Sequence, residues 1–163
     1  MKKHLQTLLP VAMALGLTGL GMSKLAWAAS ESSSFRVGID VVATCSISAA
    51  DMTFNTITTG TTAQTDAETQ ITVNCSSGAP YSVSLSNGSN FSAGRRLGSN
   101  GSFINYSLFK DNSRTAEWTL ISGLNGTGTG GDQTLPIFGR IAAGQSVPNM
   151  GAYSDTIVAT VTY

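Results

Sequence analysis

The sequence predicts an all-β protein, a β-sandwich built from many short strands. Apolar residues recur at every second position in short runs, which is the period of a strand with one buried face. Segments rich in Gly, Asn and Ser separate these runs, and no window repeats apolar residues at helical spacing. Two antiparallel sheets packed face to face fit this pattern better than a helical or mixed fold.

The alternation predicts where the strands and turns lie along the chain. The expected strands are residues 35–43, 71–75, 81–85, 104–108, 118–120, 135–141 and 155–163. Residues 76–80 are interpreted as a hairpin turn between the second and third of these. Turn-rich pieces occupy residues 87–90, 98–101, 123–131 and 144–151. The Asn-Gly sequences that begin at Asn87, Asn100 and Asn125 are interpreted as tight turns within them.

A glycine-rich run at residues 126–131 is the one segment that could be mistaken for a nucleotide-binding loop. It has no following Lys-Ser or Lys-Thr, and no helix is expected after it. The run therefore predicts a flexible surface loop.

The first 28 residues have the parts of a secretory signal peptide. Residues 1–4 form a basic head, residues 8–22 are uncharged and largely apolar, and Ala26 and Ala28 place small residues where signal peptidase cleaves. The apolar core of about 15 residues is shorter than the roughly 20 that a bilayer-spanning helix needs. We expect cleavage after Ala28, with Ala29 as the alternative site, and export to the periplasm rather than a membrane anchor.

Charge and histidine content exclude several classes of function. Nine basic and nine acidic residues give a formal charge of zero, without the basic excess that nucleic-acid binding needs. Cleavage after Ala28 would remove three lysines and His4, the only histidine, and leave a net charge of −3. Without histidine, the usual general base and metal ligand are missing. We expect no enzymatic activity, metal, cofactor, nucleic acid or small-molecule substrate. Of the basic pair Arg95 and Arg96, we expect one to donate to loop carbonyls and the other to be solvated.

Both cysteines, Cys45 and Cys75, lie in the exported part of the chain. An oxidising compartment favours a disulfide between them, while a reactive thiol is the weaker alternative because no histidine can lower its pKa. Closing a loop of about 30 residues would stabilise the fold by roughly 3 to 4 kcal/mol in the chain-entropy description.

The first expected strand, residues 35–43, follows a polar leader near the mature N-terminus. Its in-step face consists of Phe35, Val37, Ile39, Val41 and Ala43. Two interpretations fit: the strand pairs within its own domain, or it adds to a sheet of another molecule, where main-chain bonds give affinity and alternate pockets give specificity. Periodicity alone favours neither.

A series of sequence blocks resembles the spore coat protein U domain family, which includes subunits of archaic chaperone-usher pili. After Cys45 and its preceding strand, the blocks are DMTF at 51–54, ITVNCSSG at 71–78, PYSVSL at 80–85, RRL at 95–97, INYSLF at 104–109, IFGRI at 137–141 with AGQ at 143–145, GAYSDT at 151–156 and VTY at 161–163. One departure is Asn55, where the family usually has Gly after Phe.

The resemblance implies an immunoglobulin-like sandwich that lacks its last strand and is completed by donor-strand exchange. A periplasmic chaperone would fill the groove first, and the N-terminal strand of the next subunit would replace it at the outer-membrane usher. Residues 29–44 would be the donor extension and residues 45–163 the pilin domain. The donor residues would be Phe35, Val37, Gly38, Ile39, Val41 and Ala43, with Gly38 where the groove is shallow. The C-terminal strand, with Ile157, Ala159, Val161 and Tyr163 on one side, would border the groove, and its position at the end of the chain fits a missing closing strand.

The expected function is therefore that of a structural pilin. Its partners would be copies of itself or related pilins, a periplasmic chaperone and an outer-membrane usher, and its fibre would serve surface attachment and biofilm formation at the cell surface. Two alternatives remain: a coat protein of a spore or dormant cell, and a sugar- or surface-binding adhesin subunit. Tip adhesins of this type carry an extra N-terminal domain, for which about 135 mature residues leave no room.

Overall fold

A computed structural model of the chain describes residues 28–147 and 149–163. The expected signal peptide lies outside these residues, except for Ala28. The chain divides into two units, Met1–Ile39 and Asp40–Tyr163. The described residues form ten strands and no helix. They therefore include no helix long and apolar enough to cross a membrane.

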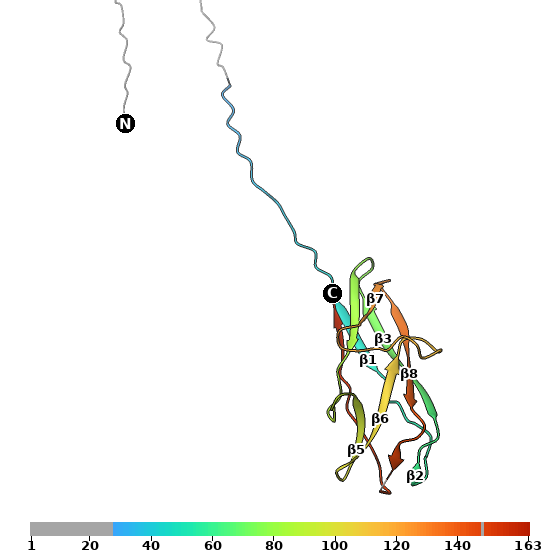
Figure 1. The fold of residues 1–163 in the computed structure, drawn as a ribbon. Coiled ribbons are helices and arrows are strands. Elements are labelled where there is room, and N and C mark those ends of the chain that lie inside the picture. The colour runs from blue at the N-terminus through green and yellow to red at the C-terminus, as the bar shows by residue number, and fades with distance from the viewer. Residues whose placement is uncertain (1–27, 148) are drawn as a thin grey trace, which may run out of the picture. The chain divides into compact units, whose positions relative to one another are not determined.

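The second unit contains all ten strands, and all of their pairings are antiparallel (Figure 1). The larger sheet has the order β1 (Cys45–Ala49), β3 (Thr65–Cys75), β8 (Asp132–Ile141), β6 (Ser102–Phe109) and β5 (Arg95–Ser99). The smaller sheet has the order β10 (Ala159–Thr162), β4 (Pro80–Leu85) and β7 (Leu124–Thr127). A short ribbon pairs β2 (Gly60–Thr61) with β9 (Ser146–Val147).

The core consists of alternate residues from the longest strands. Strands β3, β4 and β6 bury every second side chain, as their sequence alternation predicts. The buried apolar cluster comprises Ile71, Val73, Cys75, Tyr81, Val83, Leu85, Ile104, Tyr106, Leu108, Trp118, Ile137, Ile141 and Val147. The predicted all-β sandwich is confirmed.

The hairpin predicted at residues 76–80 is wrong. Strands β3 and β4 lie in different sheets, so this connection crosses from one sheet to the other. It is held against the end of β7, because Gly78 N donates to Gly128 O and Gly128 N donates to Ala79 O, both at 2.8 Å. An alternating sequence specifies which face is buried and leaves the pairing partner open, which is why the pattern resembled a hairpin.

The strand predicted at residues 118–120 is also wrong. Only Glu117 makes an isolated bridge, to Phe109, and Trp118 lies in a loop. Trp118 is nonetheless fully buried, and its Nε1 donates to Val83 O at 2.9 Å. Leu120 is 52% exposed, so Trp118 and Leu120 do not share a buried face. Trp118 anchors this loop in the core without forming a strand.

Part of the predicted glycine-rich loop is a strand. Residues Leu124–Thr127 form β7, so Asn125 starts no turn. The ring of Tyr81 occupies the place where a Cβ at residue 126 would lie, so Gly126 allows close strand packing. Asn100 and Gly101, by contrast, form the predicted two-residue turn between β5 and β6, with φ values of 45° and 80°.

The remaining differences concern the two ends of the domain and its short strands. Residues 35–43 form no strand in the described structure, and of the C-terminal run only Ala159–Thr162 does. Strands β2, β5 and β9 have no clear alternating pattern, and in β1 only Cys45 and Ile47 alternate with serines. Of the basic pair, Arg95 donates to loop carbonyls as expected, while Arg96 also donates to a carbonyl, that of Asn90, at 2.8 Å.

Candidate functional site

A cavity of about 730 Å³ opens from the surface into the sandwich core. Its floor is made of core side chains from both sheets, namely Ile71, Leu85, Ile104, Leu108, Ile137 and Ile141. Residues 49–57 line one part of its wall. The C-terminal segment lines another part through Gly151, Tyr153, Ser154, Asp155, Ile157 and Ala159. We call this cavity the groove.

The C-terminal side of the groove carries an open sheet edge. Strand β10 pairs with β4, and no other strand of the described residues pairs with it. Ile157 and Ala159 line the groove, and Val161 packs against the core from the same face. Tyr163 lies beyond the end of β10 and is 59% exposed. The structure thus brings two of the four predicted border residues to the groove.

The opposite side of the groove was missed by the sequence analysis. Met52, Phe54 and Ile57 are half-buried and pack on the core, although residues 50–57 form no strand. Phe54 and Met52 occupy the space over Gly139 of β8, where the missing side chain leaves room for them. The apolar residues at 52, 54 and 57 were the available signal, but their spacing changes from two to three.

A partly buried hydrogen bond connects the C-terminal side of the groove to the larger sheet. Tyr106 Oη on β6 donates to Asp155 Oδ2 at 2.7 Å. Asp155 also accepts from the backbone N of Asn90 at 3.0 Å. Burial, and then the bond to Asp155, raises the pKa of Tyr106. The position of residues 153–157 therefore depends on a polar contact at the wall of the groove.

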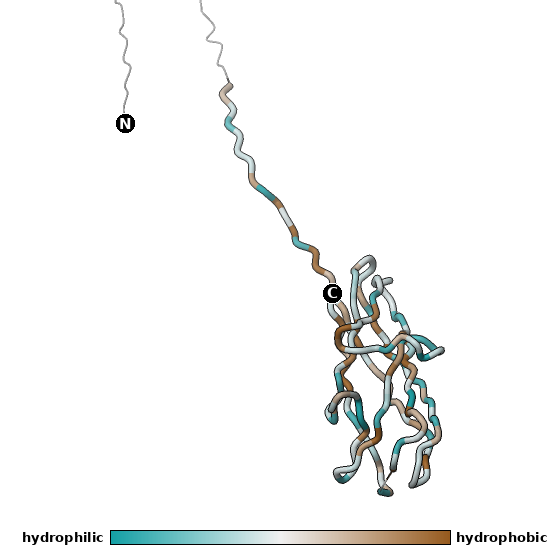
Figure 2. The backbone as a smooth tube through the Cα atoms, in the orientation of Figure 1, coloured by the Kyte–Doolittle hydropathy of each residue, from teal (hydrophilic) through white to brown (hydrophobic). Residues whose placement is uncertain are grey.

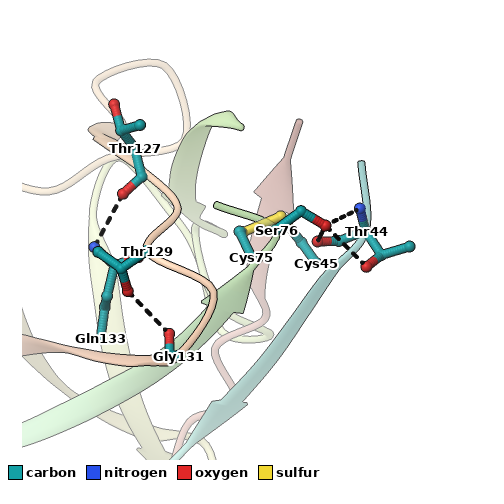
Figure 3. Close-up of a disulfide and its surroundings, with 8 residues drawn as sticks. All are labelled: Thr44, Cys45, Cys75, Ser76, Thr127, Thr129, Gly131 and Gln133. Carbon is teal, nitrogen blue, oxygen red and sulfur yellow. Dashed lines mark hydrogen bonds between the residues drawn. A yellow bond between two sulfur atoms is a disulfide. The ribbon is translucent and has the colours of Figure 1, made fainter. Parts of the chain in front are cut away.

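The N-terminal extension joins the domain beside the predicted disulfide, which the structure contains. Cys45 opens β1 directly opposite Cys75, the last residue of β3, and their sulfur atoms are bonded. Thr44 N donates to Ser76 Oγ at 3.0 Å (Figure 3). In addition, Ser76 N donates to Thr44 O at 2.9 Å. The extension thus ends at a fixed point on the domain.

The predicted donor residues are exposed and make no strand. Apolar and polar residues alternate along this segment (Figure 2). The side chains of Phe35, Val37 and Ile39 are each 87% exposed, and no atom beyond its chain neighbours lies within 4 Å of a Cβ placed on Gly38.

Among residues 28–147 and 149–163, no three His, Cys, Asp or Glu side chains gather as a metal site would require.

Comparisons with known proteins agree on one family and one kind of fold. The family model described as "Spore Coat Protein U domain" matches residues 31–160. "Protein U" of Myxococcus xanthus is 36% identical over 63 residues, which are 37% of this chain and 35% of that protein. The family match begins after residue 30 and covers well over half of the chain.

A solved structure extends the comparison to three dimensions. A chain in the crystal structure of the CsuC-CsuE chaperone-tip adhesion subunit pre-assembly complex, from the archaic chaperone-usher Csu pili of Acinetobacter baumannii, matches with a TM-score of 0.57 and 25% identity. The match covers 76% of this chain and 40% of that chain. This chain therefore spans less than half the length of either relative, and the likeness confirms the predicted immunoglobulin-like sandwich.

Proposed function

Because the chain belongs to the Spore Coat Protein U domain family, matched over residues 31–160, we propose that it is a structural pilin subunit of a chaperone-usher pilus and polymerises by donor-strand complementation. The observation that carries the proposal is the groove beside the open edge of β10. An unpaired edge above an accessible core is a liability for an exported domain unless another strand covers it.

An added strand would meet both needs of this site. Its backbone would pair with the free edge of β10, and alternate apolar side chains would fill the groove above Ile71 and Ile104. Burying each Val, Ile or Phe side chain contributes about 1.5 to 3 kcal/mol. Several in-step side chains would therefore give a long-lived joint between subunits.

The proposed donor is the extension at residues 29–44 of another copy or of a related pilin. Its inward residues are Phe35, Val37, Ile39, Val41 and Ala43, with Gly38 between them at a shallow part of the groove. A periplasmic chaperone fills the groove first, and exchange occurs at an outer-membrane usher. Residues 1–28 act as the signal peptide, and the fibre serves attachment and biofilm formation at the cell surface. The match to a chain in a chaperone–subunit pre-assembly complex supports the chaperone as a partner.

A truncation tests the donor side. Deleting residues 30–43 should leave a subunit that forms a one-to-one periplasmic complex with its chaperone but yields no fibres in electron micrographs. Normal fibres from this truncated subunit would rule out the donor role.

A pair of substitutions tests the groove side. In the truncated subunit, Ala159→Arg should lower the affinity for a synthetic peptide of residues 30–44 at least tenfold, because Ala159 lines the groove. Thr160→Arg is the matched control, since its side chain is exposed on the other face of β10. Equal affinities of the two variants, measured by calorimetry, would place the binding site elsewhere.

A second candidate is a coat protein of a spore or dormant cell. The family description and the match to Protein U support it. Neighbouring genes for a chaperone and an usher would favour the pilin, and their absence would favour the coat protein.

A further inference from the structure

We propose that the anchor at Thr44, Cys45, Cys75 and Ser76 prevents the extension from filling the groove of its own subunit, so that the partner is necessarily another molecule. This inference rests on the proposed function, in which residues 35–43 act as a donor strand. It concerns how the subunit chooses between itself and a neighbour.

A self-filled groove is the competing outcome that the subunit must avoid. Strand β1 follows the donor residues directly, and β1 and β10 are neighbours on the two sides of the groove. A donor that turned back along β1 would therefore lie in its own groove. Tethering on one chain gives effective concentrations in the millimolar range, so an intramolecular strand would outcompete strands from dilute neighbours.

The anchor leaves no residue between the donor segment and β1 free to make this turn. Cys45 is already paired with Cys75 and bonded to it covalently. Thr44, the residue before this ladder, is held by Ser76 as well: its carbonyl oxygen accepts from Ser76 N, and its N donates to the side-chain Oγ of Ser76. Only Ala43 and the residues before it remain, and the shortest hairpins need two residues in the loop.

The residues on the donor side of the anchor are poorly suited to a turn. Ala43 is preceded by Val41 and Val42. Two-residue hairpin turns require positive φ angles, which β-branched residues strongly disfavour. A turn through these positions would also remove two of the five in-step donor side chains from the groove. Filling of the groove by the subunit's own extension is therefore disfavoured twice. The turn would be strained, and fewer donor side chains would reach the groove.

The anchor itself is held from the other side by the loop after β7. Gly130 N donates to Cys75 O at 3.0 Å, and Cys75 is fully buried. Backbone oxygens of Cys75 and Ser76 occupy the space where a Cβ at residue 128 would lie, so Gly128 lets this loop pack closely. Thr44 is thus attached to a part of the domain that is fixed by both sheets (Figure 3).

Inserting a turn tests the inference. The insertion of Gly-Ser-Asn-Gly between Ala43 and Thr44 supplies a hairpin loop, and the same four residues inserted between Ser30 and Glu31 are the matched control. The first insertion should give a soluble monomer that forms fibres at least tenfold more slowly than wild type and unfolds at a higher temperature. Residues 35–43 should become resistant to protease in that monomer.

The outcomes separate this inference from the proposed function. If the control insertion and the wild type polymerise while the insertion after Ala43 stays monomeric, the inference holds. If all three polymerise at the same rate, the anchor does not select the partner, although the pilin function stands. If neither the wild type nor the control polymerises with chaperone and usher present, the proposed function fails, and the inference fails with it.

Discussion

The guanidinium of Arg95 donates from Nη1 to the carbonyl oxygen of Trp118 across 2.7 Å inside the sandwich. Its other donors reach Ser86 O at 2.8 Å and Leu85 O at 3.2 Å, and only 5% of the residue is exposed. Burial lowers the pKa of Arg95, but a guanidinium stays charged throughout the physiological range. One buried cation therefore joins β5, the end of β4 and the Trp118 loop.

Replacing Arg95 should be far more damaging than replacing its neighbour. Arg95→Met removes the donors of three carbonyl oxygens and should lower the free energy of unfolding by about 2 to 4 kcal/mol. Arg96→Ala removes one bond to Asn90 O and a contact at 4.0 Å with the Phe103 ring, and should cost about 1 kcal/mol. Urea unfolding followed by tryptophan fluorescence measures both. Equal losses would show that the Arg95 bonds contribute little.

The bond between Tyr106 and Asp155 predicts instability at high pH. The pKa of Tyr106 is raised in the folded state, so the folded protein keeps the phenolic proton that the unfolded chain loses near pH 10. The stabilisation is fully present below about pH 10 and declines above it, by at most about 1.4 kcal/mol per pH unit. The free energy of unfolding should fall over this range in wild type and stay flatter in Tyr106→Phe.

At neutral pH the same substitution should also loosen the groove. Loss of a hydrogen bond to a carboxylate predicts a decrease of about 1.5 to 3 kcal/mol in unfolding free energy. Tyr153→Phe is the comparison, because that hydroxyl donates to Asn149 O at an exposed position and should matter little. If Tyr106→Phe and Tyr153→Phe were indistinguishable by denaturant titration at pH 7, the contact would not hold residues 153–157 in place.

Glycine substitutions can separate the packed part of the segment 123–131 from its loop. Gly126→Ala should destabilise the domain by about 1 to 3 kcal/mol, because the new methyl group would overlap the Tyr81 ring. Gly131→Ala should be neutral or stabilising by about 0.4 to 1 kcal/mol, since nothing lies within 4 Å of its Cβ position. Melting temperatures of the two variants compare them directly. If Gly126→Ala had no effect on stability, residues 124–127 would be better described as the flexible loop that the sequence predicts.

The sequence was most informative where strands are long and half-buried. Strands β3, β4, β6 and β8 were predicted because their side chains alternate between core and surface over five or more residues. Alternation carries no information about the partner strand, so residues 76–80 were assigned to a hairpin although they cross between sheets. Asn125 and Gly126 are turn-forming residues by propensity, but here they pair with β4, where Gly126 leaves room for the Tyr81 ring.

For the same reason, the sequence predicts the C-terminal wall of the groove but not the wall formed by residues 52–57. Ile157 and Ala159 lie on a regular alternation and were expected at its border, and both line it. Met52, Phe54 and Ile57 lie outside any strand. Met52 and Phe54 occupy the space above Gly139, in a strand some 85 residues later. Such a contact depends on the tertiary fold, which local pattern does not encode.

The donor role of the extension predicts a position-specific block of assembly. Gly38→Tyr should slow or abolish fibre formation, because a large side chain would not fit where the receiving groove is shallow. The fold of the substituted subunit should be unchanged, since residue 38 lies in the extension before β1 and belongs to no strand of the sandwich. Ser33→Tyr, in the polar leader before the donor residues, is the matched control and should assemble normally. Fibre yield is measured by electron microscopy and the melting temperature by circular dichroism. Unchanged assembly of Gly38→Tyr would contradict the assignment of Gly38 to a shallow position, while a block by both variants would show that assembly senses bulk anywhere in the extension.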